Sequence, residues 1–211
     1  MSKQNVVIVD YRAGNLTSVK LALAALGVEA TVTMDPAVVR AADRVIFPGV
    51  GAAASAMATL NELGLADAVR DSAAAGKPFL GICLGMQILF AHSEEDGGVP
   101  TLGILPGNVV KFRPTDVRVK VPEIGWNQVR QIPAAGAEAL WNGIQDNAEF
   151  YFVHSYYAEF GTFTAGATDY AGSTFTAAVK KDNVFATQFH PEKSGRIGLR
   201  LLSNFLNWNP S

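Results

Sequence analysis

The sequence predicts a single α/β domain with a mainly parallel central sheet, helices on its flanks and an antiparallel β extension. In the first half, short apolar runs typical of buried strands alternate with helical stretches, the βαβ pattern that builds parallel sheets. In the second half, short β-rich segments follow one another, and 181–183 is typical of a hairpin between two of them. The 211 residues contain no linker or repeat, so we expect one domain over 1–211.

The first half begins with Val6–Val9, an uninterrupted apolar run that suits a strand buried on both faces. Asn15 is a suitable N-cap for a helix that runs to Leu26, and Gly27 suits the C-terminal end of this helix. The alternation then continues. The expected elements are a strand at Val28–Thr33, a short helix from Asp35-Pro36, a strand at Arg44–Phe47, helix up to Gly76, a strand at Pro78–Ile82 and a helix at Leu84–His92.

The second half is expected to be richer in strands and starts after a polar loop at 93–98. A short helix is expected around Ala137–Trp141. A last helix, from Gly195 to about Trp208, has apolar residues at helical spacing. The expected strands are Asn108–Phe112, Val117–Val121, Asn127–Ile132, Glu149–His154, Thr174–Lys180 and Val184–Phe189.

The charge balance argues against several classes of protein. With 17 Lys and Arg against 19 Asp and Glu, the net charge is −2, so a basic surface for nucleic acid is not expected. The near-apolar stretch Phe79–Ala91 is too short to cross a bilayer, and the N-terminus lacks the apolar core of a signal peptide. One cysteine cannot form an internal disulfide. We therefore expect a cytoplasmic protein that binds neither nucleic acid nor membrane.

The strongest chemical signal is Gly81-Ile82-Cys83-Leu84-Gly85, at the junction of a predicted strand and a predicted helix. It fits the Gly-x-nucleophile-x-Gly elbow, in which small flanking residues allow a sharp turn that exposes the nucleophile. A helix N-terminus favours the thiolate of Cys83, and the Leu84 N–H can donate to an oxyanion. The alternative is that Cys83 is a buried apolar residue, as many free cysteines are.

A second signal is His190-Pro191-Glu192, which follows a predicted strand. Residues two apart in extended backbone face the same side, so Glu192 can accept a hydrogen bond from one imidazole nitrogen of His190. The other nitrogen is then available as a base for Cys83. A surface turn is the alternative for this segment. A metal site made by these three residues has no close-spaced ligand pair to support it, so neither a metal nor a cofactor is expected.

A third signal is Pro48-Gly49-Val50-Gly51, between a predicted strand and a predicted helix. Glycines let backbone approach a substrate carbonyl closely, so the Val50 N–H is a candidate oxyanion donor. The segment Gly49–Ala54 also fits the dinucleotide-binding pattern G-x-G-x-x-G/A. It does not follow the first strand, however, and the acidic residues about 20 positions later lie in helical sequence, which disfavours a dinucleotide site.

Together these segments resemble the class I glutamine amidotransferases over nearly the whole chain. Gly81–Gln87 resembles the nucleophile motif of the family, and Phe189–Glu192 resembles its His/Glu motif. Other segments resemble one branch, the glutaminase subunits of imidazole glycerol phosphate synthases in histidine biosynthesis. They are Val9–Leu16, Pro48–Gly51, Gly125–Asn127 and Tyr151–Tyr156. Glu123 departs from this branch, in which His or another residue is expected, and bears on contacts near Trp126 rather than on the triad.

The resemblance implies a flavodoxin-like fold and hydrolysis of L-glutamine to glutamate and ammonia. Cys83 would attack the side-chain amide, His190 would transfer the protons, and Glu192 would orient His190. The N–H groups of Val50 and Leu84 would hold the oxyanion. The residues that would bind glutamine are Gly49, Gly51, Gln87, Ser155 and Tyr156.

The resemblance also implies a heterodimer with a (β/α)8 cyclase subunit. That partner would use the ammonia to make imidazole glycerol phosphate and aminoimidazole carboxamide ribonucleotide. The lack of a Walker motif or a basic cluster fits this division of labour, because the partner would bind the phosphorylated substrate. The residues that match interface positions of the family are Asn15, Trp126, Tyr151 and Lys193.

Several alternatives remain open. Another amidotransferase subunit, such as that of anthranilate or aminodeoxychorismate synthase, would use the same triad with a different partner. A γ-glutamyl peptidase of the same fold would use it on another substrate. A non-catalytic nucleotide-binding module would instead use Gly49–Ala54.

Overall fold

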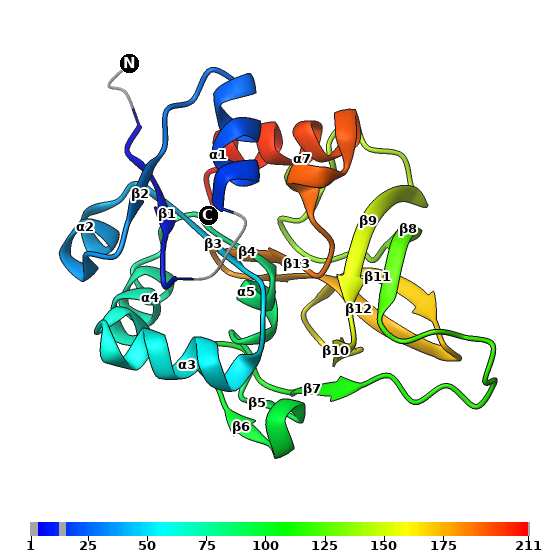
Figure 1. The fold of residues 1–211 in the computed structure, drawn as a ribbon. Coiled ribbons are helices and arrows are strands. Elements are labelled where there is room, and N and C mark those ends of the chain that lie inside the picture. Colours follow the sequence, from blue (N-terminus) through cyan, green and yellow to red (C-terminus); the bar gives the residue numbers. More distant parts are fainter. Residues whose placement is uncertain (1–3, 13–15, 211) are drawn as a thin grey trace.

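The computed structural model describes residues 4–12 and 16–210. Its central sheet begins with parallel strands in the order β2-β1-β3-β4-β13 (Figure 1). The fold class predicted from the sequence is therefore confirmed. The bounds of these strands are Val6–Val9 for β1, Thr31–Thr33 for β2, Arg44–Gly49 for β3, Phe79–Cys83 for β4 and Val184–Thr187 for β13.

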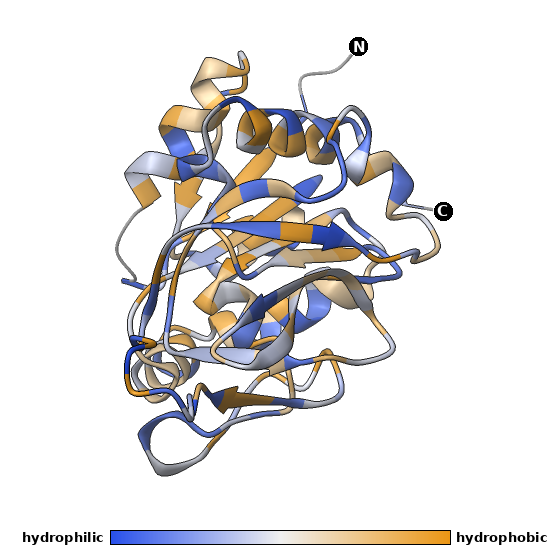
Figure 2. Ribbon diagram, turned by 90° about the vertical axis from the view of Figure 1, so that its right-hand side faces the viewer, coloured by the Kyte–Doolittle hydropathy of each residue, from blue (hydrophilic) through white to orange (hydrophobic). Residues whose placement is uncertain are grey.

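Helices cover both faces of the parallel sheet (Figure 1). On one face lie α1 (Leu16–Ala25) and α7 (Gly195–Asn207), and on the other lie α2 (Pro36–Ala41), α3 (Ala53–Glu62) and α4 (Leu65–Ala74). Alternate side chains of β1 pack against the helices on opposite faces of the sheet. Val6 and Ile8 pack with residues of α1 and α7, whereas Val7 and Val9 pack with residues of α2 to α4. The hydropathy colouring shows these apolar strands between the helices (Figure 2).

An antiparallel extension continues the sheet from β13. Strand β12 (Ser173–Lys181) pairs with β13 through a tight hairpin, in register Lys181 to Val184, which confirms the predicted turn. Further out lie β10, β7, β5 and β6, and off this path lie β11, β8 and β9. Their bounds are Tyr156–Glu159, Asn108–Lys111, His92–Ser93, Val99–Pro100, Thr164–Tyr170, Glu123–Gln131 and Ala148–His154 in that order.

Several predicted elements differ from the structure. The stretch Val117–Val121 is not a strand: Asp116 Oδ1 accepts a hydrogen bond from the Arg118 N–H at 2.9 Å, and this local turn replaces sheet pairing. The helix predicted at Leu84–His92 ends early, since α5 spans only Leu84–Gln87. The helical stretch to Gly76 is divided at Gly64, whose left-handed backbone separates α3 from α4.

Other differences concern element ends and missed strands. Strand β2 is shorter than the predicted Val28–Thr33, and β10 and β11 were not predicted. Asp35 accepts a hydrogen bond from the Ala37 N–H at 2.8 Å and caps α2. The short helices α6 (Glu138–Trp141), η1 (Glu95–Gly97) and η2 (Pro191–Lys193) complete the element list. The proposed helix cap Asn15 lies outside the described residues.

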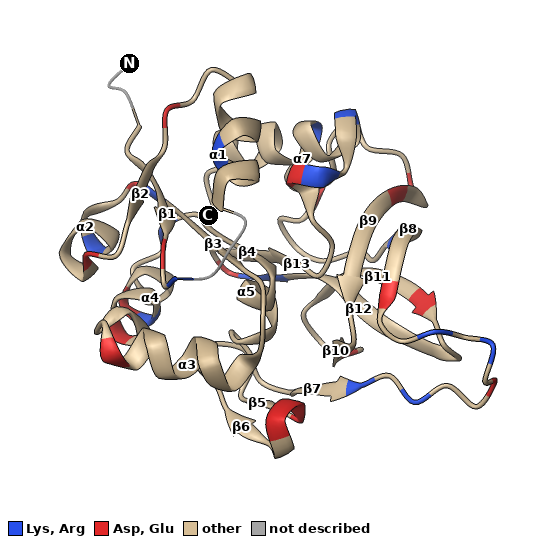
Figure 3. Cartoon of the chain, viewed as in Figure 1, with Lys and Arg blue, Asp and Glu red and all other residues tan. Residues whose placement is uncertain are grey.

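Charged residues are spread along the chain, with acidic residues on η1 and basic residues in the loop after β7 (Figure 3). An ion pair at 2.9 Å between Glu94 and Arg113 joins these two regions. Within residues 4–12 and 16–210, no helix is both long and apolar enough to cross a membrane. The same residues contain no group of three His, Cys, Asp or Glu side chains that could hold a metal ion.

Candidate active site

Three neighbouring parallel strands bring the candidate residues to one edge of the sheet. Gly49 at the end of β3 pairs in register with Cys83 at the end of β4, and β13 pairs with β4 on its other side. His190 follows the end of β13 after Gln188 and Phe189. The carboxyl ends of parallel strands lie at the same edge, which is where open α/β sheets bind ligands. Segments far apart in the sequence therefore converge on Cys83.

The backbone at Cys83 is strained, with φ 55° and ψ −113°. A non-glycine residue with positive φ is uncommon and costs free energy, so the surrounding packing must hold it. Gly85 permits this turn, because a Cβ there would come 1.8 Å from the Phe47 carbonyl oxygen. The glycine-flanked motif thus forms the sharp strand-to-helix turn that the sequence predicted.

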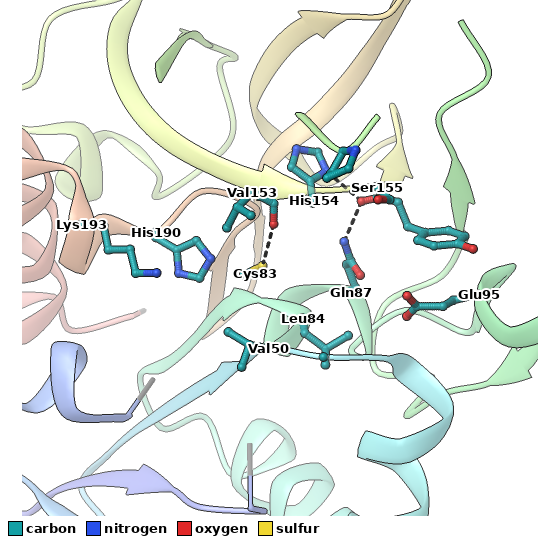
Figure 4. A pocket seen from close by; sticks show the side chains of 13 residues that line it. Val50, Cys83, Leu84, Gln87, Glu95, Val153, His154, Ser155, His190 and Lys193 are labelled. Carbon is teal, nitrogen blue, oxygen red and sulfur yellow. Dashed lines mark hydrogen bonds between the residues drawn. The ribbon is translucent and has the colours of Figure 1, made fainter. Parts of the chain in front are cut away.

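Cys83 lines a cavity of about 450 Å³. The residue is only 6% exposed, but its Sγ has polar neighbours rather than a purely apolar surrounding. The Gln188 side-chain amide donates to Sγ at 3.8 Å, and the Val153 carbonyl oxygen lies 3.9 Å from Sγ (Figure 4). The alternative of a cysteine packed only among apolar side chains therefore does not describe this site.

His190 is held in place by both its backbone and its ring. Its Nδ1 lies 2.7 Å from Glu192 Oε1, and both side chains are almost completely buried. The His190 N–H donates to the Tyr151 carbonyl at 2.9 Å, while the Ser194 hydroxyl donates to the His190 carbonyl at 2.7 Å. With Nδ1 occupied by the carboxylate, Nε2 is the nitrogen available to Cys83, and the ring lies beside Cys83 in Figure 4.

The charges around His190 favour its protonated form. Burial lowers the pKa of the imidazole, but the charge of a Cys83 thiolate and the Glu192 carboxylate outweigh this and raise the pKa to about 10. A His190 imidazolium beside a thiolate is the ion pair expected of an activated cysteine nucleophile. The three residues can therefore carry out nucleophilic attack with general acid–base assistance.

The cavity brings together most of the residues predicted to bind glutamine. Its lining includes Val50, Gly51, Leu84, Gln87, Ser155 and Tyr156. Gly49 does not line it. A Cβ at Gly49 would meet the Tyr11 hydroxyl at 1.9 Å, so this glycine lets β3 approach Tyr11 closely. The Gln87 side-chain amide donates to the Tyr156 carbonyl at 2.7 Å and to Gln188 Oε1 at 2.9 Å, so it braces the wall of the cavity.

Sequence reasoning missed Glu95, Pro122, Val153 and His154, which also line the cavity. Glu95 is its one lining carboxylate among the described residues, and its Oε2 accepts a hydrogen bond from the Ala53 N–H at 2.7 Å. Burial raises the pKa of Glu95, as does the neighbouring Asp96, while the bond from Ala53 opposes them. The acidic run 94–96 is the signal that could have pointed to this residue.

Three of the four residues assigned to a partner interface lie together. Trp126 on β8 and Tyr151 on β9 are paired across the strands, with ring centroids 6.1 Å apart, and Lys193 Nζ lies 5.9 Å from the Tyr151 ring. Trp126 is 55% exposed and its neighbour Ile124 is 64% exposed. The fourth residue, Asn15, lies outside the described residues. Lys193 also lines the cavity, so the patch reaches its rim.

Comparison with known families identifies the chain. The family described as glutamine amidotransferase class-I matches residues 7–208. The chain belongs to this family. The elbow cysteine and the His–Glu pair thus occur in a class I glutamine amidotransferase, with the cavity at the carboxyl edge of its sheet.

Curated relatives of this amidotransferase match along their full length. It is 51% identical over 220 residues to imidazole glycerol phosphate synthase subunit HisH of Dechloromonas aromatica, covering 100% of this chain and 99% of the relative. It is also 51% identical over 209 residues to the protein of that name from Nitrosococcus oceani, covering 97% and 98%. A crystal structure of a glutamine amidotransferase has a TM-score of 0.73 at 22% identity, over 96% and 98% of the two chains, and supports the fold.

Proposed function

We infer that this chain is the glutaminase subunit of an imidazole glycerol phosphate synthase. It hydrolyses L-glutamine and passes ammonia to a cyclase subunit. The observation that carries this inference is the meeting of Cys83 with the His190–Glu192 pair in one cavity, in a chain about half identical to HisH proteins along their whole length. Those relatives are named as synthase subunits, which supports a heterodimer.

The geometry supports a two-stage reaction. The Cys83 thiolate attacks the carbon of the glutamine side-chain amide, and the C=O electron pair moves to oxygen to give a tetrahedral oxyanion. Collapse of this species breaks the C–N bond, and the His190 imidazolium protonates the departing nitrogen, which leaves as ammonia. Neutral His190 then takes a proton from water, which hydrolyses the thioester and releases glutamate. Glu192 keeps Nε2 of His190 directed at these atoms through its contact with Nδ1.

We assign the oxyanion and head-group contacts from the cavity lining. The N–H groups of Val50 and Leu84 are the proposed oxyanion donors, since both residues line the cavity and Leu84 begins a helix directly after Cys83. Glutamine also carries an ammonium group, and Glu95 is suited to bind it. Ser155 and Tyr156 would complete the wall around the head group.

The cyclase is proposed to dock on the patch formed by Trp126, Tyr151 and Lys193. Trp126 is exposed and Tyr151 is half-buried, and aromatic residues beside a cavity rim are typical of interface anchors. Docking there would place the partner next to η2, the short turn that contains Glu192 and directly follows His190. Ammonia could then leave the cavity toward the cyclase. We also propose that the heterodimer acts in the cytoplasm, where a single catalytic cysteine stays reduced.

Replacement of the nucleophile tests the proposed reaction. With Cys83→Ala, glutamine-dependent synthesis by the complex is expected to fall by more than roughly 10³-fold, because no thioester can form. Synthesis from added ammonium salt should continue at the wild-type rate, since the cyclase can then take ammonia from solution and does not need Cys83. Both rates are measured from formation of imidazole glycerol phosphate. Glutamine turnover by this variant would remove Cys83 from the mechanism.

A covalent probe separates the alternatives. Diazo-oxo-norleucine, an electrophile that resembles glutamine, should add once to Cys83, which mass analysis of the chain and its peptides would locate. Absence of an adduct together with binding of NAD would favour a nucleotide-binding module. Co-purification with an anthranilate or aminodeoxychorismate synthase subunit, rather than a cyclase, would instead favour another amidotransferase role.

A further inference from the structure

A second buried His–Glu pair lies behind the glutamine cavity and takes no part in the reaction described above. Glu123 on β8 and His154 on β9 are directly opposite in the strand register, and Glu123 Oε2 lies 3.0 Å from His154 Nε2. Their side chains are 4% and 2% exposed. His154 and Pro122, the neighbour of Glu123, both line the cavity, so the pair stands immediately behind its wall.

The surroundings of this pair hold both side chains in fixed positions. The other carboxylate oxygen of Glu123, Oε1, accepts a hydrogen bond from the Asn127 amide at 2.8 Å. The His154 ring is enclosed by the rings of Phe112, Phe152 and Phe175, with centroids 5.2 to 5.7 Å away. Burying a carboxyl group and an imidazole in apolar surroundings costs free energy, and their mutual contact adds little net stability over apolar side chains of similar size. A role in stability alone therefore does not account for the pair.

The hydrogen-bond partners of the His154 ring identify Nδ1 as the nitrogen that donates to the cavity wall. Nδ1 lies 2.8 Å from the Tyr156 carbonyl oxygen, and a carbonyl only accepts hydrogen bonds, so Nδ1 carries a proton. On the other side of the ring, Nε2 faces the Glu123 carboxyl group at 3.0 Å. Glu123 thus contacts the ring whose opposite nitrogen is bonded to the cavity wall.

The Tyr156 carbonyl is a shared acceptor within the wall. Besides His154, it accepts a hydrogen bond from Gln87 Nε2 at 2.7 Å, and Figure 4 shows both bonds meeting at this point. Gln87 also donates to Gln188, whose own amide donates to Cys83 Sγ. The segment 154–156 is thus tied on one side to Glu123 and on the other to residues around the nucleophile.

We propose that Glu123 is a positioning residue for glutamine binding, which fixes the cavity wall at 154–156 through its contact with His154. The proposal rests on the glutaminase function inferred above. It predicts an effect on substrate binding rather than on the reactivity of the thiol, because Ser155 and Tyr156 line the cavity whereas Glu123 does not reach Cys83.

The test compares variants of Glu123 in the complex with the cyclase. Glu123→Leu removes the carboxylate and should raise the KM for glutamine at least 10-fold while kcat stays within 2-fold. Glu123→Gln should keep the KM within 3-fold of wild type, since a side-chain amide can donate to Nε2 and accept from Asn127. Glu149→Gln, an exposed carboxylate on β9, is the matched control and should leave both constants unchanged.

Alkylation of Cys83 by iodoacetamide, which has no amino-acid head group, separates binding from reactivity. Its rate, followed by the mass of this chain, should be the same in wild type and Glu123→Leu. An unchanged KM in Glu123→Leu, equal losses in kcat and alkylation, or failure of Glu123→Gln to restore KM would each overturn the proposal.

Two further outcomes are informative. If Glu123→Leu does not fold, Glu123→Asp serves, because it retracts the carboxylate by about 1.5 Å and should raise KM several-fold, whereas a wild-type KM in this variant would overturn the proposal. If the wild-type complex hydrolyses no glutamine, the inferred glutaminase function fails and the proposal fails with it. If the wild-type complex is active and the Glu123 variants keep the wild-type KM for glutamine, only the positioning role of Glu123 is overturned and the glutaminase function stands.

Discussion

At the residue scale, the site depends on a few side chains whose roles follow from their neighbours. Cys83 takes a strained backbone because Gly85 leaves room for the Phe47 carbonyl, and His190 stays charged because two anionic groups face it. The meeting of Cys83 with the His190–Glu192 pair was predictable from the sequence, since each of these residues lies in a short motif with a defined local geometry. His154 and Glu123 were not, because only the folded sheet brings His154 to the cavity and places Glu123 behind it, whereas the acidic run 94–96 was the one signal for Glu95.

The charge state of His190 leads to a pH prediction. The pKa of His190 in the folded chain is about 10, above its ordinary 6.5, so the imidazolium persists at neutral pH and loses its proton as the pH rises through about 10. Glutaminase kcat should fall over that range, because no acid then protonates the leaving ammonia. The contribution of this proton to stability is likewise complete below pH 6.5 and lost by about pH 10.

Glu192→Gln should shift the alkaline fall in kcat, the alkaline limb of the pH profile, to lower pH. The substitution removes one of the charges that raise the pKa of His190. We expect kcat at neutral pH to fall roughly 10²- to 10⁴-fold. The measurement is glutamate release by the complex between pH 6 and about pH 11. Glu149→Gln is the control, and an alkaline limb that stays in place in Glu192→Gln would contradict the assigned role of Glu192.

At the element scale, the position of the catalytic turn depends on how closely α7 packs against η2. Gly198 makes this approach possible, because a Cβ there would lie 1.9 Å from the Pro191 carbonyl oxygen. The sequence predicted α7 from its apolar spacing but not the reason for this glycine. At Val117–Val121 the sequence-based prediction was wrong in the other direction. The β-branched residues there are typical of a strand, but the segment forms a turn that begins at Asp116.

Gly198→Ala should therefore impair catalysis without touching any reacting group. Alanine favours helices by about 1 kcal/mol over glycine, but the clash with Pro191 should reverse this and lower the free energy of unfolding by roughly 1–3 kcal/mol. Because η2 carries Glu192, kcat should also fall. Thermal unfolding and steady-state kinetics measure both effects.

Gly195→Ala is the control for this variant. It adds a methyl group in the same helix, at a positive φ of 59° but with nothing within 4 Å. It should cost stability through backbone strain and leave kcat unchanged. Equal kinetic effects of the two substitutions would argue against a specific contact between Gly198 and Pro191.

At the scale of the whole molecule, the parallel sheet supplies the catalytic edge and the antiparallel extension supplies β8 and β9, which carry the proposed docking patch. The sequence predicted both regions and their order, but β10 and β11 escaped notice. Strand β10 pairs with β7, which is distant in the sequence, whereas β11 forms a hairpin with β12 across Ala171 and Gly172 and also pairs with the distant β8. The cavity lies between the two regions, with Cys83 from one and Ser155 from the other.

This arrangement predicts activation by the partner. The chain alone should hydrolyse glutamine slowly, and the ligand-bound cyclase should accelerate it, since we propose that docking aligns the oxyanion donor of the glycine-bearing segment 48–51. Trp126→Ala should weaken cyclase binding by roughly 2 kcal/mol, measured by calorimetry. Phe160→Ala, at a similarly exposed aromatic residue, should bind normally. Full glutaminase activity of the isolated chain would contradict the activation.

The three-residue turn η2 has one more consequence. Glu192, which is proposed to orient the base, and Lys193, which belongs to the proposed docking patch, are adjacent in the chain and share a single helical turn. A change that adapts this turn to a different partner surface would also disturb the imidazole one residue away. Substitutions in η2 should therefore change partner binding and catalytic activity together. A change of partner that preserves activity would have to begin elsewhere on the patch, on β8.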